Sequence, residues 1–309
     1  FGVKDYDTQE PVTAQTLFQA ASISKPVTGV AAMRFVQDGT ISLDTNVNNK
    51  LVSWQVPDNQ FTVTEKVTLR RLLGHRGGIP QGGKVGTDRD APYPTLLDIL
   101  NGVPPYDPVR VTYIPGSDFI YSNEGYCIVQ QLLMDISQKS FPKLIKDIIF
   151  TPLNMNSSTF EQQLTPEWET RAASGHNGYS VLEGKYQLHP KLAAAGLWST
   201  SEDLARFLIE FLLSLQGRSN IILDLAIINH MIEPLTKFDD TKDYGVGIGI
   251  KSFGGETYYW HSGGFEGFNC VMYGHETAGV GMVLMTNHCD LEWEVFIEAV
   301  GTHYSWPGF

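Results

Sequence analysis

A serine and a lysine three positions apart, Ser22 and Lys25, could supply a nucleophile and the base that activates it. A serine hydroxyl attacks poorly until a base takes its proton, and a lysine in a desolvated site can lose its own proton and serve as that base. Because Pro26 fits only near the first turn of a helix, we expect a helix to begin close to Ser22 and to place both side chains on one face. The N-terminus of such a helix also presents N–H groups where an oxyanion would form.

A tyrosine and an asparagine, Tyr121 and Asn123, form the only Tyr-x-Asn in the chain, just before an expected helix. A tyrosine hydroxyl held near a lysine can pass protons. An asparagine side chain can accept a hydrogen bond from the lysine and donate one to a substrate carbonyl. The alternative is a packing aromatic residue followed by a helix cap at Ser122 or Asn123.

A third polar segment, His261-Ser262-Gly263-Gly264, lies at the end of an expected strand. An edge strand can bind an extended substrate through its backbone, and its N–H groups can help to form an oxyanion hole. Glycine lets a ligand approach the backbone closely. The alternative is a turn between strands that carries a surface histidine.

Two of these short patterns occur twice, so neither is specific alone. Ser140 and Lys143 repeat the Ser-x-x-Lys spacing, but Pro142 and the polar surroundings indicate a loop that leads into a helix. His75, Gly77 and Gly78 repeat the His-x-Gly-Gly pattern of residues 261–264.

The elements that must position these groups differ along the chain. A strand-like start leads into a helix over residues 20–37 whose apolar residues cover nearly every side, which is typical of a buried helix. The middle of the chain is loop-rich, with short helices expected at 68–73, capped by Thr68, and at about 124–137. Residues 80–116 are rich in Pro and Gly and indicate irregular connections.

The last third of the chain is strand-rich. Ser199 and Thr200 resemble the start of a capping box that opens an amphipathic helix. Short strands joined by tight turns then predict an antiparallel meander, followed by a last helix at 291–303. The expected strands span 244–250, 257–261, 268–273 and 279–285.

These elements predict an α+β fold: an antiparallel sheet flanked by helices, plus a mostly helical lobe. We expect one catalytic domain over residues 1–309. Its α/β lobe would comprise about 1–40 and 200–309, and its mostly helical, loop-rich lobe about 41–199.

The composition narrows the class of protein. A net charge of −12 and the lack of any basic run argue against a nucleic-acid partner. The most apolar segment, 207–215, contains Glu210 and is far shorter than the roughly 20 residues of a membrane span. Three scattered cysteines neither build a disulfide framework nor show the paired spacing of a zinc site.

The order of the three motifs resembles the serine β-lactamase and penicillin-binding protein family, which pairs Ser-x-x-Lys with two further polar triplets. With a tyrosine in its second motif, the chain resembles the class C-like branch of this family, which includes D-stereospecific peptidases and esterases. The resemblance extends to the segments 18–26, 72–80 and 195–204.

That resemblance implies a role for each motif. Ser22 would be acylated, and Lys25 and Tyr121 would move its proton to the leaving group and from the deacylating water. Asn123 would position Lys25 and the substrate amide. No metal or organic cofactor is implied.

The third motif would bind the substrate through residues 261–264. His261 stands where the family often has lysine, beside the substrate carboxylate or the Tyr121 hydroxyl, and the N–H groups of Ser22 and Gly264 would form the oxyanion hole. Histidine here resembles the peptidase and esterase members, and its titration would make activity depend on pH near 6–7.

Other readings stay open. One is a non-catalytic or penicillin-binding sensor domain of the same fold. A Ser-His-Asp hydrolase lacks its Gly-x-Ser-x-Gly elbow here, and a zinc hydrolase lacks His-Glu-x-x-His. The resemblance favours an exported protein, and it suggests that a helix and strands precede Phe1 in relatives. The sequence does not distinguish a β-lactam, a D-amino-acid peptide and a short-chain ester as substrate, and it does not indicate an oligomeric state.

Overall fold

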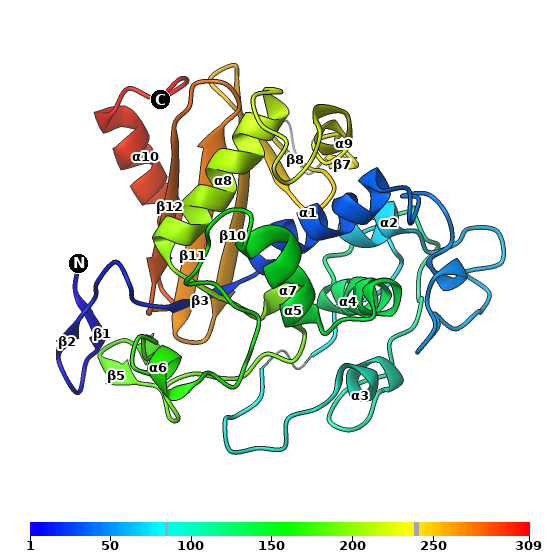
Figure 1. The fold of residues 1–309 in the computed structure, drawn as a ribbon, viewed down its shortest axis with the longest axis horizontal. Helices are drawn as coiled ribbons and strands as arrows, with labels where there is room; N and C mark the ends of the chain where they lie inside the picture. Colours follow the sequence, from blue (N-terminus) through cyan, green and yellow to red (C-terminus); the bar gives the residue numbers. More distant parts are fainter. Residues whose placement is uncertain (84–85, 238–240) are drawn as a thin grey trace.

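The computed structural model describes residues 1–83, 86–237 and 241–309. Within these residues the largest element is a six-stranded antiparallel sheet in which sequence neighbours are also sheet neighbours (Figure 1). This topology is the meander that the spacing of strands and turns predicts. The strands are β7 (Thr236–Lys237), β8 (Lys242–Tyr244), β9 (Gly249–Phe253), β10 (Glu256–Phe265), β11 (Phe268–His275) and β12 (Gly281–Thr286).

Helices cover both faces of this sheet. Along β11, Cys270 and Met272 point into the main core, which also contains the apolar side of α8 (Ser201–Leu215). Val271 points to the opposite face, where it packs in a smaller cluster with Ile297 of α10 (Trp293–His303). The two-residue alternation of a strand therefore distributes β11 between two cores.

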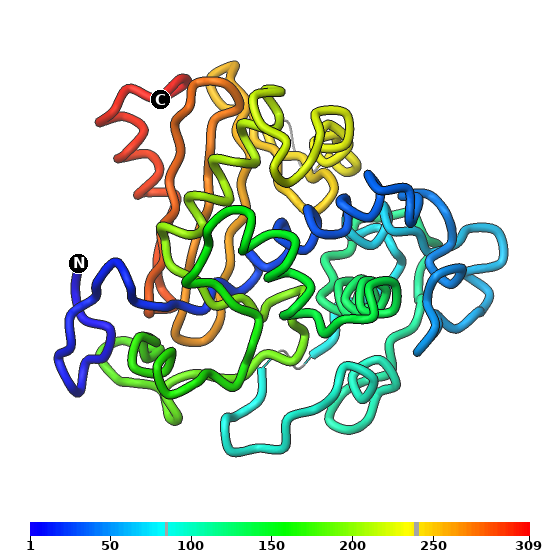
Figure 2. Tube along the Cα trace, in the orientation of Figure 1, coloured from blue at the N-terminus to red at the C-terminus, as the bar shows by residue number. Residues whose placement is uncertain are grey.

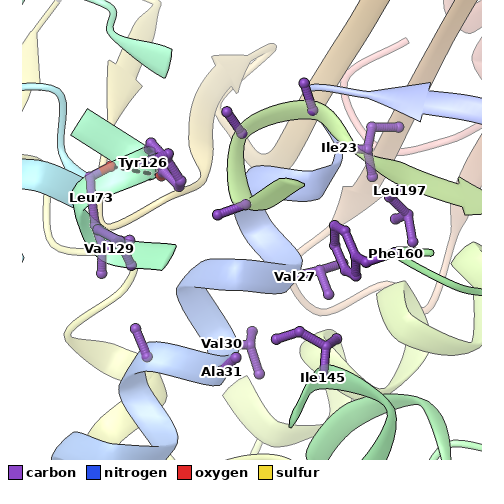
Figure 3. Close-up of a cluster of buried hydrophobic side chains, with 14 of the residues drawn as sticks. Ile23, Val27, Val30, Ala31, Leu73, Tyr126, Val129, Ile145, Phe160 and Leu197 are labelled. Atoms are coloured by element: carbon purple, nitrogen blue, oxygen red, sulfur yellow. Dashed lines mark hydrogen bonds between the residues drawn. The ribbon is translucent and has the colours of Figure 1, made fainter. Parts of the chain in front are cut away.

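The first long helix, α1 (Ser24–Gln37), runs between the sheet and the helical part of the chain (Figures 1 and 2). It is buried from Ser24 to Met33, as its apolar residues on all sides predict. Figure 3 shows its residues Val27 and Val30 among side chains that come from several other segments. The other helices are α2 (Leu69–Leu73), α3 (Leu96–Asn101), α4 (Asn123–Ser137), α5 (Phe141–Ile145), α6 (Pro166–Glu169), α7 (Leu192–Ala195) and α9 (Leu225–Asn229), with a 3-10 helix at Val47–Asn49 and a π-helix at Lys146–Phe150.

The remaining strands form short pairs. They are β1 (Val3–Asp5) with β2 (Glu10–Pro11), β3 (Phe18–Ala21) with β6 (Leu197–Ser199), and β4 (His176–Asn177) with β5 (Ser180–Val181). The expected α+β class, a sheet flanked by helices beside a mostly helical part, is confirmed. The division into lobes at about residues 40 and 200 remains our proposal.

The start of the first helix differs from the sequence prediction. Residues 18–21 form strand β3 and pair with β6, so the helix begins at Ser24 rather than at residue 20. Ala21, the last residue of β3, adopts a positive φ of 46°, an unfavourable conformation for a residue with a Cβ atom. This bend places Ser22 in the turn that enters the helix.

Two further segments differ from the prediction. Residues 244–250 form the ends of two strands rather than one, because the chain leaves the sheet at Gly245 and turns through Gly247 with φ of 80°. The Pro- and Gly-rich segment 80–116 contains a helix, α3. Thr95 and Asp98 form a reciprocal capping box at its start, a local signal that the proline and glycine content obscures.

The apolar segment 207–215 lies within α8, where its buried face packs on the sheet. Across the described residues, no helix combines the length and the apolar character that crossing a bilayer requires. The three cysteines are free, and Cys127 and Cys270 are buried.

Candidate active site

Ser22 and Lys25 meet at the entrance of α1. Ser22 lies in the turn after β3, and its carbonyl oxygen accepts the backbone N–H of Lys25 at 3.0 Å. This local bond brings the Lys25 Nζ atom to 3.1 Å from the Ser22 Oγ atom. The spacing of three residues therefore gives the contact that the sequence predicts.

The Lys25 amine is fully buried among oxygen atoms. Besides Ser22, its Nζ atom donates to Asn123 Oδ1 at 2.8 Å and to the Ala194 carbonyl at 2.9 Å. Burial lowers the pKa of Lys25 to about 7, so a large share of the amine is neutral near neutral pH. The Asn123 and Ala194 oxygens can only accept. A neutral amine that donates to both keeps its lone pair for the Ser22 hydroxyl proton.

Tyr121 approaches the same serine from another segment. Its hydroxyl donates to Ser22 Oγ at 3.0 Å, and the Lys25 Nζ atom lies 4.6 Å from its ring centroid. Burial raises the pKa of Tyr121 to about 12, so the side chain rests as a neutral phenol. Its ring packs against the His75 ring, with centroids 4.2 Å apart and the ring planes tilted by 31°. The phenol hydroxyl is thus held where it can exchange a proton with Ser22.

The start of α4 fixes Tyr121 and Asn123 on either side of a helix cap. Ser122 is the cap, and its Oγ accepts the Gly125 N–H at 3.0 Å. The Ser122 N–H donates to His75 Nδ1 at 3.1 Å, and the Asn123 N–H donates to Gln81 Oε1 at 2.9 Å. The capping interpretation and the chemical one therefore hold together, because the cap orients the chemical groups.

His261 is buried and neutral. Its Nδ1 pairs with the Ser262 carbonyl at 2.7 Å, which requires a proton on Nδ1, so Nε2 accepts from the Tyr244 hydroxyl at 3.1 Å. Burial, with the nearby Lys25 charge, lowers the pKa of His261 to about 3. The expected titration of His261 near pH 6–7 is therefore wrong. A neutral imidazole also cannot form an ion pair with a substrate carboxylate.

Residues 261–264 form one wall of a pocket at Ser22. β9 pairs with β10 only as far as Trp260, so the following residues of β10 lie beyond that ladder on the side toward the pocket. The pocket has a volume of about 290 Å³. It is lined by Ser22, Phe119, Tyr121, Tyr244, Gly249, Trp260, His261, Ser262, Gly263 and Gly264. The structure thus brings all three motifs to one place.

Several groups at the site were not found from the sequence. His75 supports Tyr121 and Ser122, and its only signal was the second His-x-Gly-Gly pattern. The backbone carbonyl of Ala194 accepts a hydrogen bond from Lys25. Because every residue has such a carbonyl, no residue type could have predicted this contact. Tyr244 binds His261 from a different strand. The second Ser-x-x-Lys pattern is a helix start, as predicted, and its Lys143 pairs with Asp147 on the surface.

A serine, a lysine and a tyrosine that meet between an antiparallel sheet and a helical region define the class of serine β-lactamases and penicillin-binding proteins. The Beta-lactamase family model matches residues 1–296, and the chain belongs to this family.

Solved structures share this fold. An octameric penicillin-binding protein homologue from Pyrococcus abyssi has a TM-score of 0.78 at 25% identity, covering 99% of this chain and 70% of the other. The D-amino acid amidase of Ochrobactrum anthropi SV3 has a TM-score of 0.77 at 25% identity, covering 97% of this chain and 89% of the amidase.

Curated relatives are matched over part of their length. Penicillin-binding protein 4* of Bacillus subtilis (strain 168) is 26% identical over 62% of this chain and 41% of its own length. Protein flp of Staphylococcus aureus (strain NCTC 8325 / PS 47) is 24% identical over 52% of this chain and 32% of its own length. The matched region thus spans less than half the length of these relatives.

Proposed function

We propose that this chain is a serine hydrolase that cleaves an amide or ester through an acyl-enzyme on Ser22. The observation that carries the proposal is the double contact at the Ser22 Oγ atom, 3.1 Å from the Lys25 amine and 3.0 Å from the Tyr121 hydroxyl. Family membership and the D-amino acid amidase neighbour support a hydrolase of this superfamily.

In acylation, neutral Lys25 takes the Ser22 proton while the Oγ atom bonds to the substrate carbonyl carbon. The carbonyl oxygen becomes an oxyanion, which the N–H groups of Ser22 and Gly264 would stabilise. The bond to the leaving group then breaks. The proton on Lys25 passes through the Tyr121 phenol to the nitrogen or oxygen of the leaving group. Once the leaving group departs, Ser22 remains acylated as an ester.

Deacylation reverses the proton path. Water attacks the ester carbon and gives a proton to the Tyr121 and Lys25 pair, and the Ser22 oxygen leaves and recovers its proton. Asn123 keeps the Lys25 amine aimed at Ser22 throughout both steps. The pKa of Lys25, about 7, suits a group that must accept and release a proton near neutral pH.

The pocket favours a substrate without a carboxylate. Among its described lining residues there is no lysine or arginine, and aromatic side chains surround Ser22. His261 is uncharged, so a carboxylate beside the scissile bond finds no cationic partner in this wall. We therefore place amides and esters without a carboxylate, such as a D-amino-acid amide or a short-chain ester, ahead of β-lactams and D-Ala-D-Ala peptides.

A panel of four substrates tests this proposal: a D-amino-acid amide, p-nitrophenyl butyrate, nitrocefin and a D-Ala-D-Ala peptide. We expect faster hydrolysis of the two compounds that lack a carboxylate, the D-amino-acid amide and p-nitrophenyl butyrate, and complete loss in Ser22→Ala. Ser140→Ala is the matched control, since it removes the serine of the second Ser-x-x-Lys pattern.

Intact mass after incubation with a fluorescent penicillin tests the acyl-enzyme separately. An adduct that is absent in Ser22→Ala supports the nucleophile assignment. Hydrolysis that survives in Ser22→Ala assigns the nucleophile elsewhere. A wild-type chain that forms an adduct but hydrolyses nothing fits the sensor alternative, in which Ser22 binds a ligand covalently without turnover.

A further inference from the structure

A buried ion pair lies next to the Lys25 amine and takes no part in the proposed reaction. The Lys191 ammonium contacts the Glu124 carboxylate, and the two side chains are 1% and 8% exposed. The second oxygen of Glu124 accepts the backbone N–H of Gly82 at 2.7 Å. Because separating such a pair would leave an uncompensated charge in the interior, it holds its two segments together firmly.

Each partner is joined to one of the two oxygens that bind Lys25. Glu124 directly follows Asn123 in the first turn of α4. Lys191 directly precedes α7, and its carbonyl oxygen accepts the N–H of Ala194 at 3.1 Å. The pair thus ties the segment that presents the Asn123 side chain to the segment that presents the Ala194 carbonyl.

The pair also supplies the charge around Lys25. The titratable side chains near the amine and its aromatic neighbours are His75 after α2, Tyr121 before α4, Glu124, Tyr126 and Cys127 of α4, Lys191 before α7, Tyr244 of β8 and His261 of β10.

Most of these groups are neutral near neutral pH. Burial holds the pKa of both histidines well below its usual value and raises the pKa of the three tyrosines. Burial also raises the pKa of Cys127 to about 12. Glu124 and Lys191 are then the ionic members of the set, with opposite signs. Apart from burial and Cys127, their charges act on the pKa of Lys25 in opposite directions: Glu124 raises it and Lys191 lowers it.

We infer that the buried Lys191–Glu124 pair is a positioning element of the active site, which clamps the two oxygen acceptors around the Lys25 amine and cancels its own charge there. This inference rests on the proposed function of Lys25 as the base for Ser22. Neither residue is among the residues that line the pocket at Ser22, so both act through Lys25.

The test measures how fast a fluorophosphonate probe labels Ser22 at a series of pH values. Wild type is compared with Glu124→Gln, Lys191→Met and the double variant. Glutamine keeps an oxygen for the Gly82 N–H, and methionine keeps the length of the lysine chain. Lys143→Met and Asp147→Asn, which alter an exposed ion pair, are the matched controls and should leave the pH profile unchanged.

The two single variants should move the midpoint of labelling in opposite directions. Glu124→Gln leaves a buried cation, so the midpoint should fall by at least about half a pH unit. Lys191→Met leaves a buried anion, so the midpoint should rise by a similar amount. The double variant should return to the wild-type midpoint, with a plateau rate about tenfold lower because the clamp is gone.

Shifts in the same direction, or no shift in either single variant, would overturn the inference. A double variant that labels at the wild-type plateau rate would contradict the proposed clamping of the two oxygen acceptors. If a single variant does not fold by circular dichroism, the double variant decides: a midpoint displaced from wild type refutes the charge balance. Failure of the wild-type chain to label at Ser22 refutes the proposed function instead, so the two failures are distinguishable.

Discussion

Gly263 of β10 packs directly against the backbone of Ser22. A Cβ atom at residue 263 would lie 2.8 Å from the Ser22 amide nitrogen and 2.5 Å from the Ala20 carbonyl oxygen. Real Cβ contacts are not this short, and the obstructing atoms belong to backbone. The strand that forms the pocket wall can therefore approach the nucleophile only because residue 263 has no side chain.

Gly263→Ala should displace Ser22 and lower kcat/KM by about a hundredfold or more. The neighbouring Gly264→Ala is the steric comparison, since its nearest contact to an added Cβ would be 3.9 Å away; it should lose less than about tenfold. Ester hydrolysis and thermal melting of both variants check this. Equal losses of kcat/KM in the two variants would show that close packing at residue 263 does not determine the position of Ser22.

Tyr121→Phe keeps the ring on His75 and removes the hydroxyl that contacts Ser22. Loss of a general acid–base group should reduce kcat by about a hundred- to ten-thousandfold. The melting temperature should change little, because the packing stays. A variant with near wild-type kcat would exclude the phenol from the proton path, while a collapse in melting temperature would point to a structural role.

His75→Asn tests the residue that supports Tyr121. His75 has a positive φ of 57°, which asparagine tolerates, and the amide oxygen can still accept the Ser122 N–H. The ring contact with Tyr121 is lost, so kcat should fall about tenfold to a hundredfold through misplacement of the phenol. The kcat and KM of ester hydrolysis, measured separately, check this. A change confined to KM would contradict a positioning role.

The pH dependence of activity should follow Lys25. Only the neutral amine can take the Ser22 proton, so kcat/KM should rise through a pKa of about 7 and then level off. His261 should add nothing between pH 5 and 8, because its pKa is about 3. If the pH profile of kcat/KM for His261→Asn keeps the wild-type midpoint, this assignment is supported. A lost or displaced midpoint would show instead that His261 is the titrating group.

Lys25 should also make stability rise with pH. Its folded pKa of about 7 lies below the ordinary 10.5, so between these values the unfolded chain binds more protons. The free energy of unfolding then increases with pH across that window. Urea unfolding of wild type and Lys25→Met checks this: the wild type should gain stability relative to the variant as pH rises from about 7 to about 10. Parallel curves would contradict it.

His261→Lys should alter substrate preference. A lysine there would offer the pocket wall a cation, so the ratio of kcat/KM for a D-Ala-D-Ala peptide over p-nitrophenyl butyrate should rise about tenfold. His261→Asn, which adds no charge, should leave that ratio unchanged. If both variants shift the ratio equally, the missing cation does not explain the preference.

Local features of the fold were readable from the chain. Thr68 caps α2, as its position before an apolar repeat predicts. The contact of Ser22 with Lys25 follows from a spacing of three residues at a helix start. The prediction of a single strand over 244–250 was wrong, because the break depends on a tertiary contact. Gly245 packs against the backbone of Met231, which is distant in sequence. A contact of this kind cannot be predicted from the residues next to Gly245 in the sequence.

Residue types and their order along the chain were enough to nominate Ser22, Lys25 and Tyr121, because helix starts, caps and strand patterns are set by near neighbours. The protonation states were not accessible in that way. Lys25 has a pKa of about 7 and His261 a pKa of about 3 because distant segments enclose them and exclude water. Desolvation depends on the packing of the whole molecule, so the folded chain, and no single motif, turns an ordinary lysine into a base and keeps the histidine neutral.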